Sequence, residues 1–399
     1  MTRSRQGCGA TNSRRAAAFA VARWIATHGY LGEMLPDGPD RAFVQDLAYT
    51  TVRRFRALRA VLGQLVSKWP KGEMEALLLV GAAQILDMPD VPDFAAVNET
   101  VAAAKGCPNK SVAKVVNGVL RNLIRRREEF EAYLTAAPLA ERESFPNGLV
   151  ERWIERYGEA DADRLCRWHN EPADTWLAYP PGAPEPFVRL ARGRKVAEVE
   201  GYGAGAFIVQ DPATAGAVEL LDVKPGQKVL DFCAAPGGKT IQTAWRMGGA
   251  QTGGRLVAQE VTPARRRRLE ENLRRVGLDW VETVSAVEGG ERFDRVLADV
   301  PCSNTGVLRR RPDARWRWTR EHLGELTKLQ AEIADKAAEH VAPGGLLVYS
   351  TCSNEPEEND GQIAAFLAAH PAFEEVARKE SLPFASGHDG AFACALKRR

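Results

Sequence analysis

The sequence predicts an all-helical N-terminal domain followed by an α/β domain with a parallel sheet. In residues 12–135, apolar side chains recur at three- and four-residue spacing, which is typical of helices packed on a common core. From about residue 205, short runs rich in valine and leucine alternate with helical segments, and this alternation indicates a parallel sheet covered on both faces. We therefore divide the chain into residues 1–135, a weakly defined mixed α/β module at 136–200, and residues 201–399.

The helical domain is expected to contain five segments, and Pro89, Pro92 and Pro108 interrupt the pattern between them. Ser13 is placed to cap the first segment. The segments are 14–28, 42–66, 73–87, 95–105 and 111–134. In the middle module we expect a helix at 148–158 and a weak strand at 187–191.

The α/β domain is expected to have strands at 228–232, 254–260, 279–285, 293–299 and 344–350, with helices at 263–277 and 323–341. In parallel α/β sheets, ligands bind beyond the carboxyl ends of the strands. Every motif discussed below lies at such an end, so we expect the functional site at that edge of the sheet.

Composition excludes several classes of protein. The 399 residues are 45% hydrophobic and 27% charged with a net charge of +2, which argues against a fibrous or disordered chain. No apolar run approaches the ~18 residues of a membrane helix, and no apolar stretch follows the basic N-terminus to form a signal peptide. The seven scattered cysteines match neither a disulfide framework nor a zinc cluster. We expect a monomer in the cytoplasm, with no membrane contact and no metal.

The first chemical motif is the loop CAAPGGKT at 233–240, which follows a strand and opens a helix. Its paired glycines allow close approach to a ligand, and the helix N-terminus supplies free N–H donors. A phosphate-binding P-loop would need glycine in place of Cys233, and the G-x-G-x-x-G pattern is absent. A nucleoside cofactor such as S-adenosylmethionine remains, with Glu260 at the next strand end to hold its ribose. A βα turn without a ligand is the alternative.

Two further loops each place a cysteine after a strand. Asp299 ends one strand shortly before Cys302, and Cys352 lies at the end of another. An isolated cysteine near a strand is more often an inert buried side chain. Two cysteines beside a cofactor loop instead favour catalysis. The cysteines expected to be structural are Cys8, Cys107, Cys166 and Cys394.

Methylation of carbon 5 of a pyrimidine is one reaction that requires such a set of groups. Carbon 5 becomes sufficiently nucleophilic only after a thiolate has added to carbon 6. An acid hydrogen-bonded to N3 and the exocyclic amine of cytosine would stabilise the charge that develops in the ring. The carbon 5 proton must then leave so that the thiol can be eliminated, and a second residue can assist that step.

Together the loops resemble the RNA cytosine-C5 methyltransferases of the Nol/Nop/Sun (Fmu) family. The resemblance rests on CAAPGGKT (233–240), DVPCSNTGVLRRRPD (299–313) and YSTCSNEPEEN (349–359), and extends to segments 205–215 and 388–399. The helical segments VNETVAAAK (97–105) and KVVNGVLRNL (114–123) resemble a NusB-like RNA-binding domain. The combination is typical of bacterial members that methylate a cytosine in small-subunit (16S) ribosomal RNA. It implies a Rossmann-like methyltransferase domain that uses S-adenosyl-L-methionine on 16S rRNA or a small-subunit precursor.

The resemblance implies a role for each matching residue. Cys352 is the nucleophile that forms the covalent adduct, and Cys302 assists product release. Asp299 contacts the target base near the methionine end of the cofactor, and Lys239 faces the same pocket. Glu260 holds the ribose, where the family more often has aspartate. The residues that line the cofactor are Cys233, Ala234, Ala235, Pro236, Gly237, Gly238 and Lys239, with Glu260 and Asp299.

The adenine contact departs from the family pattern. Ala286 lies near the position where the family usually has an aspartate, in a shortened loop. We expect Glu282, Glu288 or a backbone group to make this contact instead.

Basic segments are the candidates for RNA contacts. In RRRPDARWRWTR (309–320), arginines can bind phosphates and Trp316 or Trp318 can stack on a base, whereas a solvated loop with core tryptophans is the alternative. The four arginines at 265–268 point in different directions on a helix and indicate a solvated face. The residues expected to contact RNA are Arg310, Arg311, Arg315, Trp316, Arg121 and Arg125.

Other functions stay open on the sequence alone. A methyltransferase acting on a protein or a small molecule would need the cofactor loop but not two cysteines. A non-catalytic RNA-binding or ribosome assembly factor could keep the fold without a use for Cys302, Cys352 and Asp299. Methylation of tRNA or of another rRNA is a further alternative.

Overall fold

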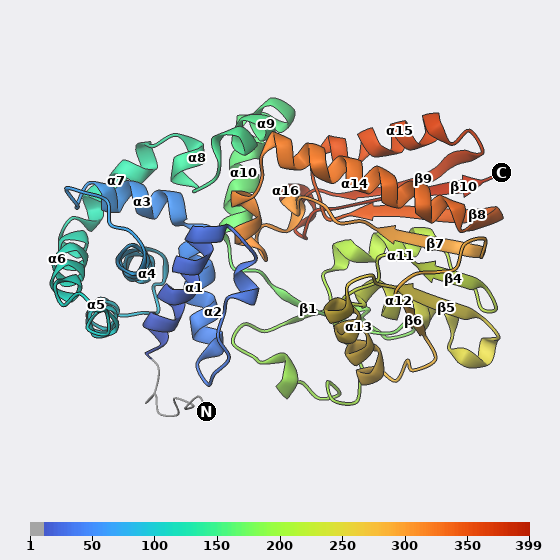
Figure 1. Cartoon of the computed structure of the whole chain (residues 1–399), viewed down its shortest axis with the longest axis horizontal. Helices are drawn as coiled ribbons and strands as arrows, with labels where there is room; N and C mark the ends of the chain where they lie inside the picture. The colour runs from blue at the N-terminus through green and yellow to red at the C-terminus, as the bar shows by residue number, and fades with distance from the viewer. Residues whose placement is uncertain (1–11) are drawn as a thin grey trace, which may run out of the picture. The chain divides into compact units, whose positions relative to one another are not determined.

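The computed structural model describes residues 12–399, which form two compact units. The helical unit comprises residues 12–170 and 311–318, and the sheet unit comprises residues 171–310 and 319–399 (Figure 1). Cys8 lies outside the described residues.

The helical unit is built from helices joined by short turns. Asn12, and not Ser13, caps the first helix, because its side chain accepts the backbone N–H groups of Arg14 and Arg15. The helices are α1 Ser13–Thr27, α2 Arg41–Arg53, α3 Phe55–Gly63, α4 Glu73–Asp87, α5 Asp93–Ala104, α6 Ser111–Arg125, α7 Arg127–Ala136, α8 Leu139–Arg142, α9 Asn147–Tyr157 and α10 Glu159–Asn170.

Two of the expected helices are each divided in the structure. Segment 42–66 breaks at Arg54, and segment 111–134 breaks at Arg126, where ψ rises to 10° and 20°. The break at Arg54 is accompanied by a half-buried ion pair, in which Arg54 Nε lies 2.9 Å from Asp87 Oδ1. Apolar periodicity continues across such a break, which is why the sequence predicts one continuous helix where the structure has two.

The helical unit extends to Asn170, beyond the predicted boundary at residue 135. The helix expected at 148–158 is α9, and its buried side chains include Leu149, Val150 and Trp153. Phe145 and Trp153 pack edge to face with ring centroids 5.6 Å apart. Residues 139–170 are therefore part of the helical unit and not a linker.

The sheet unit begins with a small antiparallel sheet in the order β2-β1-β3. Its strands are β1 Thr175–Ala178, β2 Phe187–Leu190 and β3 Ile208–Val209. The weak strand expected at 187–191 corresponds to β2. Only the sheet part of the expected mixed module at 136–200 thus belongs to this unit.

The main sheet has seven strands in the order β6-β5-β4-β7-β8-β10-β9, in which β4 to β8 are parallel and β10 is antiparallel to both its neighbours. This is the predicted Rossmann-like arrangement; β10 lies in the segment 388–399 that resembles the family's last strand, and β9 is an additional strand that the sequence does not predict. The strands are β4 Lys228–Asp231, β5 Arg255–Gln259, β6 Glu282–Val284, β7 Phe293–Asp299, β8 Val341–Thr351, β9 Phe373–Ser381 and β10 Ala391–Arg398.

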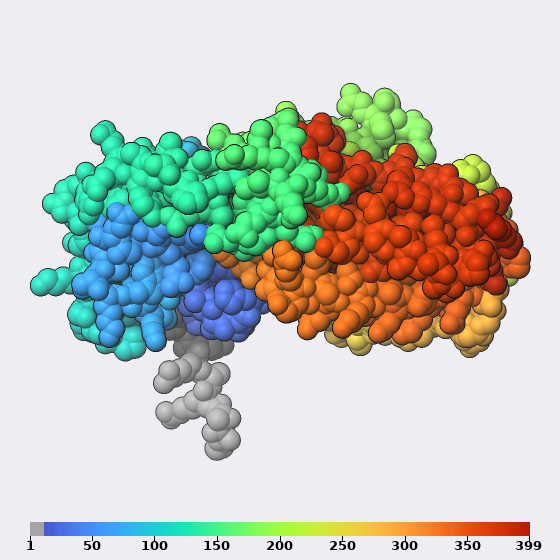
Figure 2. Space-filling model, turned by 90° about the horizontal axis from the view of Figure 1, so that it is seen from above, coloured from blue at the N-terminus to red at the C-terminus, as the bar shows by residue number. Residues whose placement is uncertain are grey.

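Helices cover both faces of this sheet, as expected for βα units (Figure 1). Val229, Leu256 and Leu297 pack under one set of helices, whereas the next residues along each strand pack under the other. The first set is α11 Ala215–Leu221, α12 Gly238–Met247 and α13 Pro263–Arg275; the second is α14 Arg320–Glu339 and α15 Asp360–Ala369. The segments from α14 onward form one continuous surface, orange to red in Figure 2.

Candidate functional site

The three predicted loops meet at the carboxyl edge of the main sheet. Asp231 ends β4, Asp299 ends β7, and Thr351 ends β8. The strand register pairs Asp231 with Leu297 and Asp299 with Ser350. The cofactor loop and the two cysteine loops consequently begin at neighbouring points of one edge.

A charged pair lies at the centre of this edge. Lys239 Nζ, in the first turn of α12, lies 2.7 Å from Asp299 Oδ2, and Ser350 Oγ donates to Asp299 Oδ1 over 2.6 Å. Burial alone would lower the pKa of Lys239, but the Asp299 carboxylate outweighs it and raises the pKa. Lys239 is therefore an ammonium that fixes one oxygen of Asp299.

The two cysteines are in contact. Cys302 Sγ and Cys352 Sγ are 3.3 Å apart, with Cys302 buried and Cys352 half-buried. The hydrogen bond with Cys352, together with burial, raises the pKa of Cys302 well above its ordinary value. Cys302 thus keeps its proton, and Cys352 is the more accessible sulfur of the pair.

A buried carboxylate joins the two cysteine loops. Glu358 accepts hydrogen bonds from the backbone N–H of Ser303 (2.8 Å), from Ser303 Oγ (2.5 Å) and from Ser353 Oγ. Gln330 Nε2 donates to the same carboxylate over 2.8 Å. Because Ser303 and Ser353 each follow a cysteine, Glu358 fixes the spacing of the two thiols.

Glycines allow the same loops to approach closely. The N–H of Gly306 donates to the Cys352 carbonyl over 3.0 Å, and the N–H of Gly390 donates to the Gly306 carbonyl over 2.8 Å. A Cβ atom on Gly306 would lie 2.8 Å from the Cys352 carbonyl oxygen and 2.7 Å from Gly390 Cα. A side chain at Gly306 would therefore push the Cys352 loop away.

The cofactor loop is a tight cradle that fits a nucleoside cofactor. Gly237 has a φ of 108°, and a Cβ atom there would lie 2.8 Å from Leu269 Cδ1. α12 begins at Gly238 and directs its free N–H groups toward the loop. Burial raises the pKa of Cys233 to about 12, so this thiol is an inert lining group.

Helix α13 supports the cradle from the side. Arg265 Nη2 donates to the Ala235 carbonyl over 3.0 Å, and Asn272 Nδ2 donates to the Pro236 carbonyl over 2.8 Å. Arg265 is exposed, as expected for a solvated face at 265–268, and also makes this contact, whereas Arg266 is half-buried. Its neighbours Arg267 and Arg268 are exposed, as expected.

Glu260 lies directly after β5 and is buried. Its Oε1 accepts the N–H of Thr262 over 2.9 Å, and Arg265 Nε lies 3.4 Å from its Oε2. These contacts hold the carboxylate at the strand end where the ribose is expected.

Of the groups expected to contact adenine, Glu282 is engaged elsewhere, which leaves Glu288 or a backbone group. Glu282 begins β6 and pairs with Arg255 at the start of β5, at the edge of the sheet away from the cofactor loop. The hydrogen bond from Arg255 lowers the pKa of Glu282 and commits it to this pair. Glu288 is exposed in the loop after β6, and the N–H of Val287 donates to Gln259 Oε1 over 2.8 Å.

Arg315 and Trp316 do not fit the expected RNA contacts, because both pack inside the helical unit. Arg315 is fully buried and donates to the carbonyls of Ser144 and His169, and its guanidinium lies 3.8 Å from the Phe145 ring centroid. Burial lowers the pKa of Arg315 well below its ordinary value. Trp316 Nε1 donates to the Val52 carbonyl over 2.9 Å. The alternative interpretation, in which the tryptophans of this segment are core residues, is therefore correct.

The other predicted RNA contacts have different surroundings. Arg310 pairs with Asp211 over 2.8 Å and with Asp389, so its charge is neutralised within the sheet unit. Arg311, Arg121 and Arg125 are exposed. On α6, Arg121 and Arg125 donate to neighbouring asparagine side chains.

Four residues of the site were absent from the sequence-based prediction: Glu358, Asn304, Ser350 and Asp231. Asp231 is buried, receives a 2.6 Å hydrogen bond from Thr240 Oγ1, and has a pKa raised to about 7 by burial. Three of them lie within the recognised motifs, and Asp231 lies in the predicted strand just before the first motif. Their roles depend on contacts between loops, which spacing along the chain does not reveal.

Burial also accounts for the cysteines that were expected to be structural. Cys107, Cys166 and Cys394 are buried, and burial raises the pKa of each.

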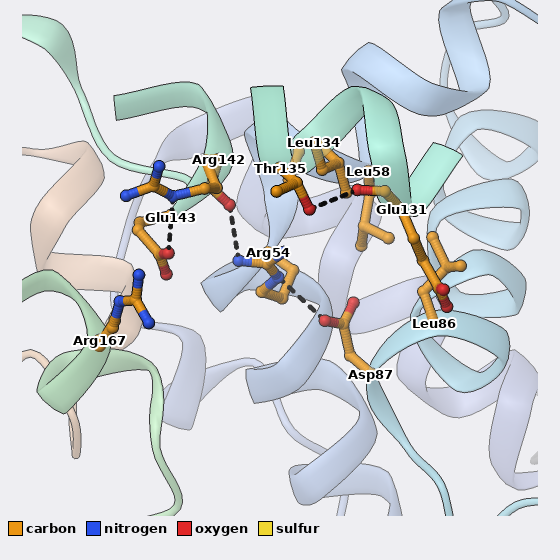
Figure 3. A pocket seen from close by; sticks show the side chains of 11 residues that line it. Arg54, Leu58, Leu86, Asp87, Glu131, Leu134, Thr135, Arg142, Glu143 and Arg167 are labelled. Atoms are coloured by element: carbon orange, nitrogen blue, oxygen red, sulfur yellow. Dashed lines mark hydrogen bonds and ion pairs between the residues drawn. The ribbon is translucent and has the colours of Figure 1, made fainter. Parts of the chain in front are cut away.

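A separate pocket of about 440 Å³ lies in the helical unit (Figure 3). Its charged lining is internally paired, for example Arg54 with Asp87 and Arg142 with Glu143. It brings no cysteine together with an acid and lies in the other unit from the strand-end loops. We place the chemistry at the sheet edge for this reason.

The fold and the strand-end site together define a methyltransferase, and comparison with known proteins gives its family. Residues 218–392 match the family model for the 16S rRNA methyltransferase RsmB/F, and residues 11–125 match the NusB family. The chain belongs to the RsmB/F family of 16S rRNA methyltransferases. Membership confirms the predicted Rossmann-like fold and the predicted activity of an rRNA methyltransferase that uses S-adenosylmethionine.

Similar curated proteins extend over nearly the whole chain. The ribosomal RNA small subunit methyltransferase B of Klebsiella pneumoniae subsp. pneumoniae is 32% identical and covers 97% of this chain and 98% of its own length. The protein of the same name from Serratia proteamaculans is 31% identical and covers 96% of this chain and 98% of its own. Both domains of the chain therefore have counterparts in these relatives.

Solved structures agree on the fold. The crystal structure of PH0851 superposes with a TM-score of 0.77 at 21% identity and covers 99% of this chain and 100% of its own. NSun6 from Pyrococcus horikoshii with SFG superposes with a TM-score of 0.57 at 17% identity, covering 64% of this chain and 99% of its own.

Within residues 12–399, helices lack the combination of length and apolar character that crossing a membrane requires.

Proposed function

We propose that this protein methylates carbon 5 of a cytosine in 16S ribosomal RNA, with Cys352 as the nucleophile. The observation that carries the proposal is the 3.3 Å contact between Cys302 and Cys352, beside the Lys239–Asp299 pair. A methyltransferase acting on an oxygen, a nitrogen or a protein needs no thiol at this point. Methylation of carbon 5 needs one thiol to add to carbon 6 of the ring, and a second thiol can assist product release.

The residues divide the work according to their position. The cradle at 233–239 and Glu260 hold S-adenosylmethionine, which supplies an electrophilic methyl group when bound. Cys352, the more accessible thiol, adds to carbon 6 of the base and makes carbon 5 nucleophilic. Asp299 is held by Lys239 and Ser350 in an orientation that can receive the base edge and stabilise the charged ring.

Cys302 is placed to act after methyl transfer. The carbon 5 proton must leave before the Cys352–carbon 6 bond can break. The carbon 5 proton passes to solvent, and Cys302, which keeps its own proton, can donate a hydrogen bond to the Cys352 sulfur as that sulfur leaves carbon 6. Its loss would therefore leave the protein joined to the RNA.

The RNA contacts that remain as proposals are the exposed Arg311, Arg121 and Arg125. The NusB-like helices carry the last two, so we propose that this domain binds rRNA through phosphates. Monomeric state and cytoplasmic location stay predictions from the sequence.

The proposal is tested by incubating the protein with methyl-labelled S-adenosylmethionine and either unmethylated 16S transcript or unmethylated small-subunit particles. We expect label on one cytosine, mapped by bisulfite sequencing, and none with Cys352→Ala. Label on tRNA instead of 16S rRNA would favour the alternative substrate. Label on another atom or base, unchanged labelling by Cys352→Ala, or no label on the transcript, the particles or tRNA would contradict the proposal.

A further inference from the structure

Asn304 contacts both cysteines from an unusual backbone position. It follows Cys302 by two residues and has a φ of 62°, in the left-handed region that asparagine tolerates better than most residues. Its Nδ2 donates to the Cys302 carbonyl over 2.8 Å, and its Oδ1 accepts from Cys352 Sγ over 3.4 Å. Asn304 lies in the motif at 299–313, but the proposed mechanism gives its side chain no role.

The Cys302 carbonyl determines which way the amide of Asn304 points. The reversed amide would place two acceptors 2.8 Å apart, which is unfavourable. The atom that faces Cys352 is therefore Oδ1, which can only accept. Cys352 must supply its single proton to this bond.

This arrangement decides the direction of the bond between the thiols. At 3.3 Å, either sulfur could be the donor. Because the Cys352 proton is engaged by Asn304, the proton between the sulfurs belongs to Cys302. The three side chains form a ring of hydrogen bonds that runs from Cys302 to Cys352, on to Asn304, and back to the Cys302 backbone.

We propose that Asn304 is a positioning residue that holds the resting nucleophile Cys352 as a thiol and makes Cys302 the donor within the cysteine pair. The proposal rests on the proposed function, in which Cys352 is the nucleophile. The two neighbours then act in opposite directions: Asn304 Oδ1 favours the thiol, and the Cys302 S–H favours the thiolate.

The other charged groups near Cys352 form a constant background. Lys239 from α12 interacts electrostatically with Cys352. Asp299 lies behind Lys239, and Glu358 lies beside Cys302. Substitutions at Asn304 leave all of these groups in place, so a change in thiolate content reports on the amide.

The test is the pH dependence of alkylation of Cys352 by iodoacetamide in the full-length protein, measured by mass spectrometry of the peptide that contains it. Asn304→Gly accepts the same backbone conformation and removes the acceptor. We expect its alkylation midpoint to fall by roughly half to one pH unit, which is about three- to tenfold more thiolate at pH 7. Asn304→Asp has nearly the same shape but adds negative charge, and we expect its midpoint to rise. Easier reagent access would change the plateau rate and not the midpoint.

Cys302→Ala checks the direction of the thiol pair. Loss of a donor to Cys352 should move the alkylation midpoint to higher pH, whereas loss of an acceptor should not. Unchanged midpoints in both Asn304 variants, or a lower midpoint in Cys302→Ala, would overturn the proposal. The assay requires neither RNA nor methyl transfer, so the expected shifts in a protein that fails to methylate RNA would refute the proposed function alone.

Discussion

The loop after β7 contains two stretches that the structure uses differently: one contributes to the proposed site, and the other packs in the helical unit. Residues 302–306 lie at the sheet edge, and their contacts with Cys352 and Glu358 build the proposed catalytic site. Residues 311–318 belong to the helical unit, where Arg315 and Trp316 are packed. The sequence predicts a functional role for both stretches. A pair of cysteines after strand ends has few uses other than catalysis. An arginine, in contrast, can either bind a phosphate or donate hydrogen bonds inside a core.

The largest effect expected from this contrast concerns Arg315. Arg315→Ala removes a buried guanidinium that satisfies several carbonyl groups, and it leaves a cavity against Phe145. We expect the free energy of unfolding to fall by about 3 kcal/mol or more. Denaturant unfolding measures this change.

Arg311→Ala is the matched control for Arg315→Ala. Arg311 is an exposed arginine of the same segment, so we expect a change within about 0.5 kcal/mol. If Arg315→Ala were as stable as the wild type and bound RNA more weakly, Arg315 would be an RNA contact, as the sequence predicts, and not a core residue.

Glu358→Gln sharpens the account of the first stretch. One oxygen becomes an NH2 group that must face donors from Ser303, Ser353 or Gln330. We expect a loss of about 2 kcal/mol in unfolding free energy and a methylation rate at least tenfold lower, because the cysteine loops lose their common anchor. The exposed neighbour Glu357 provides the control. Equal behaviour of Glu357→Gln and Glu358→Gln would contradict the bracing role.

The contribution of Asp231, the last residue of β4, to the free energy of unfolding should depend on pH. The pKa of Asp231 is raised by burial to about 7, so the folded protein binds this proton more tightly than the unfolded chain does. This contribution to stability is present near pH 4 and is lost as the pH rises through 7. Between pH 5 and pH 8, we expect the unfolding free energy of the wild type to fall by more than 1 kcal/mol relative to Asp231→Asn. Parallel pH profiles of the two proteins would show that Asp231 is ionised when folded.

The smallest effect is expected at the exposed arginines of α6. The double variant Arg121→Ala/Arg125→Ala should bind 16S rRNA a few-fold more weakly, with the salt dependence reduced by about two phosphate contacts. Arg267→Ala on α13 is an exposed control. Equal affinities of the double variant and the control, measured by filter binding at several salt concentrations, would remove these arginines from the interface.

The predictable parts of the molecule were those fixed by local pattern. Alternating strands and helices gave the sheet and its functional edge, and Lys239, Asp299, Cys302 and Cys352 converge there. β9 escaped prediction because its sequence FEEVARKES is mostly charged and buries little more than Phe373. Glu358 and Asn304 could not be assigned roles, since their partners lie on other loops. The fate of Arg315 depends on which core surrounds it, and spacing along the chain carries no information on that.

The central claim is that Cys352 forms the covalent bond to the base and Cys302 assists its release. The most direct measurement is denaturing electrophoresis of Cys302→Ala after incubation with S-adenosylmethionine and the RNA or particle that the wild type methylates. We predict a stable protein–RNA adduct that carries the methyl group and is absent from Cys302→Ala/Cys352→Ala. An adduct that persists without Cys352, or rapid turnover by Cys302→Ala with no adduct, would contradict the account.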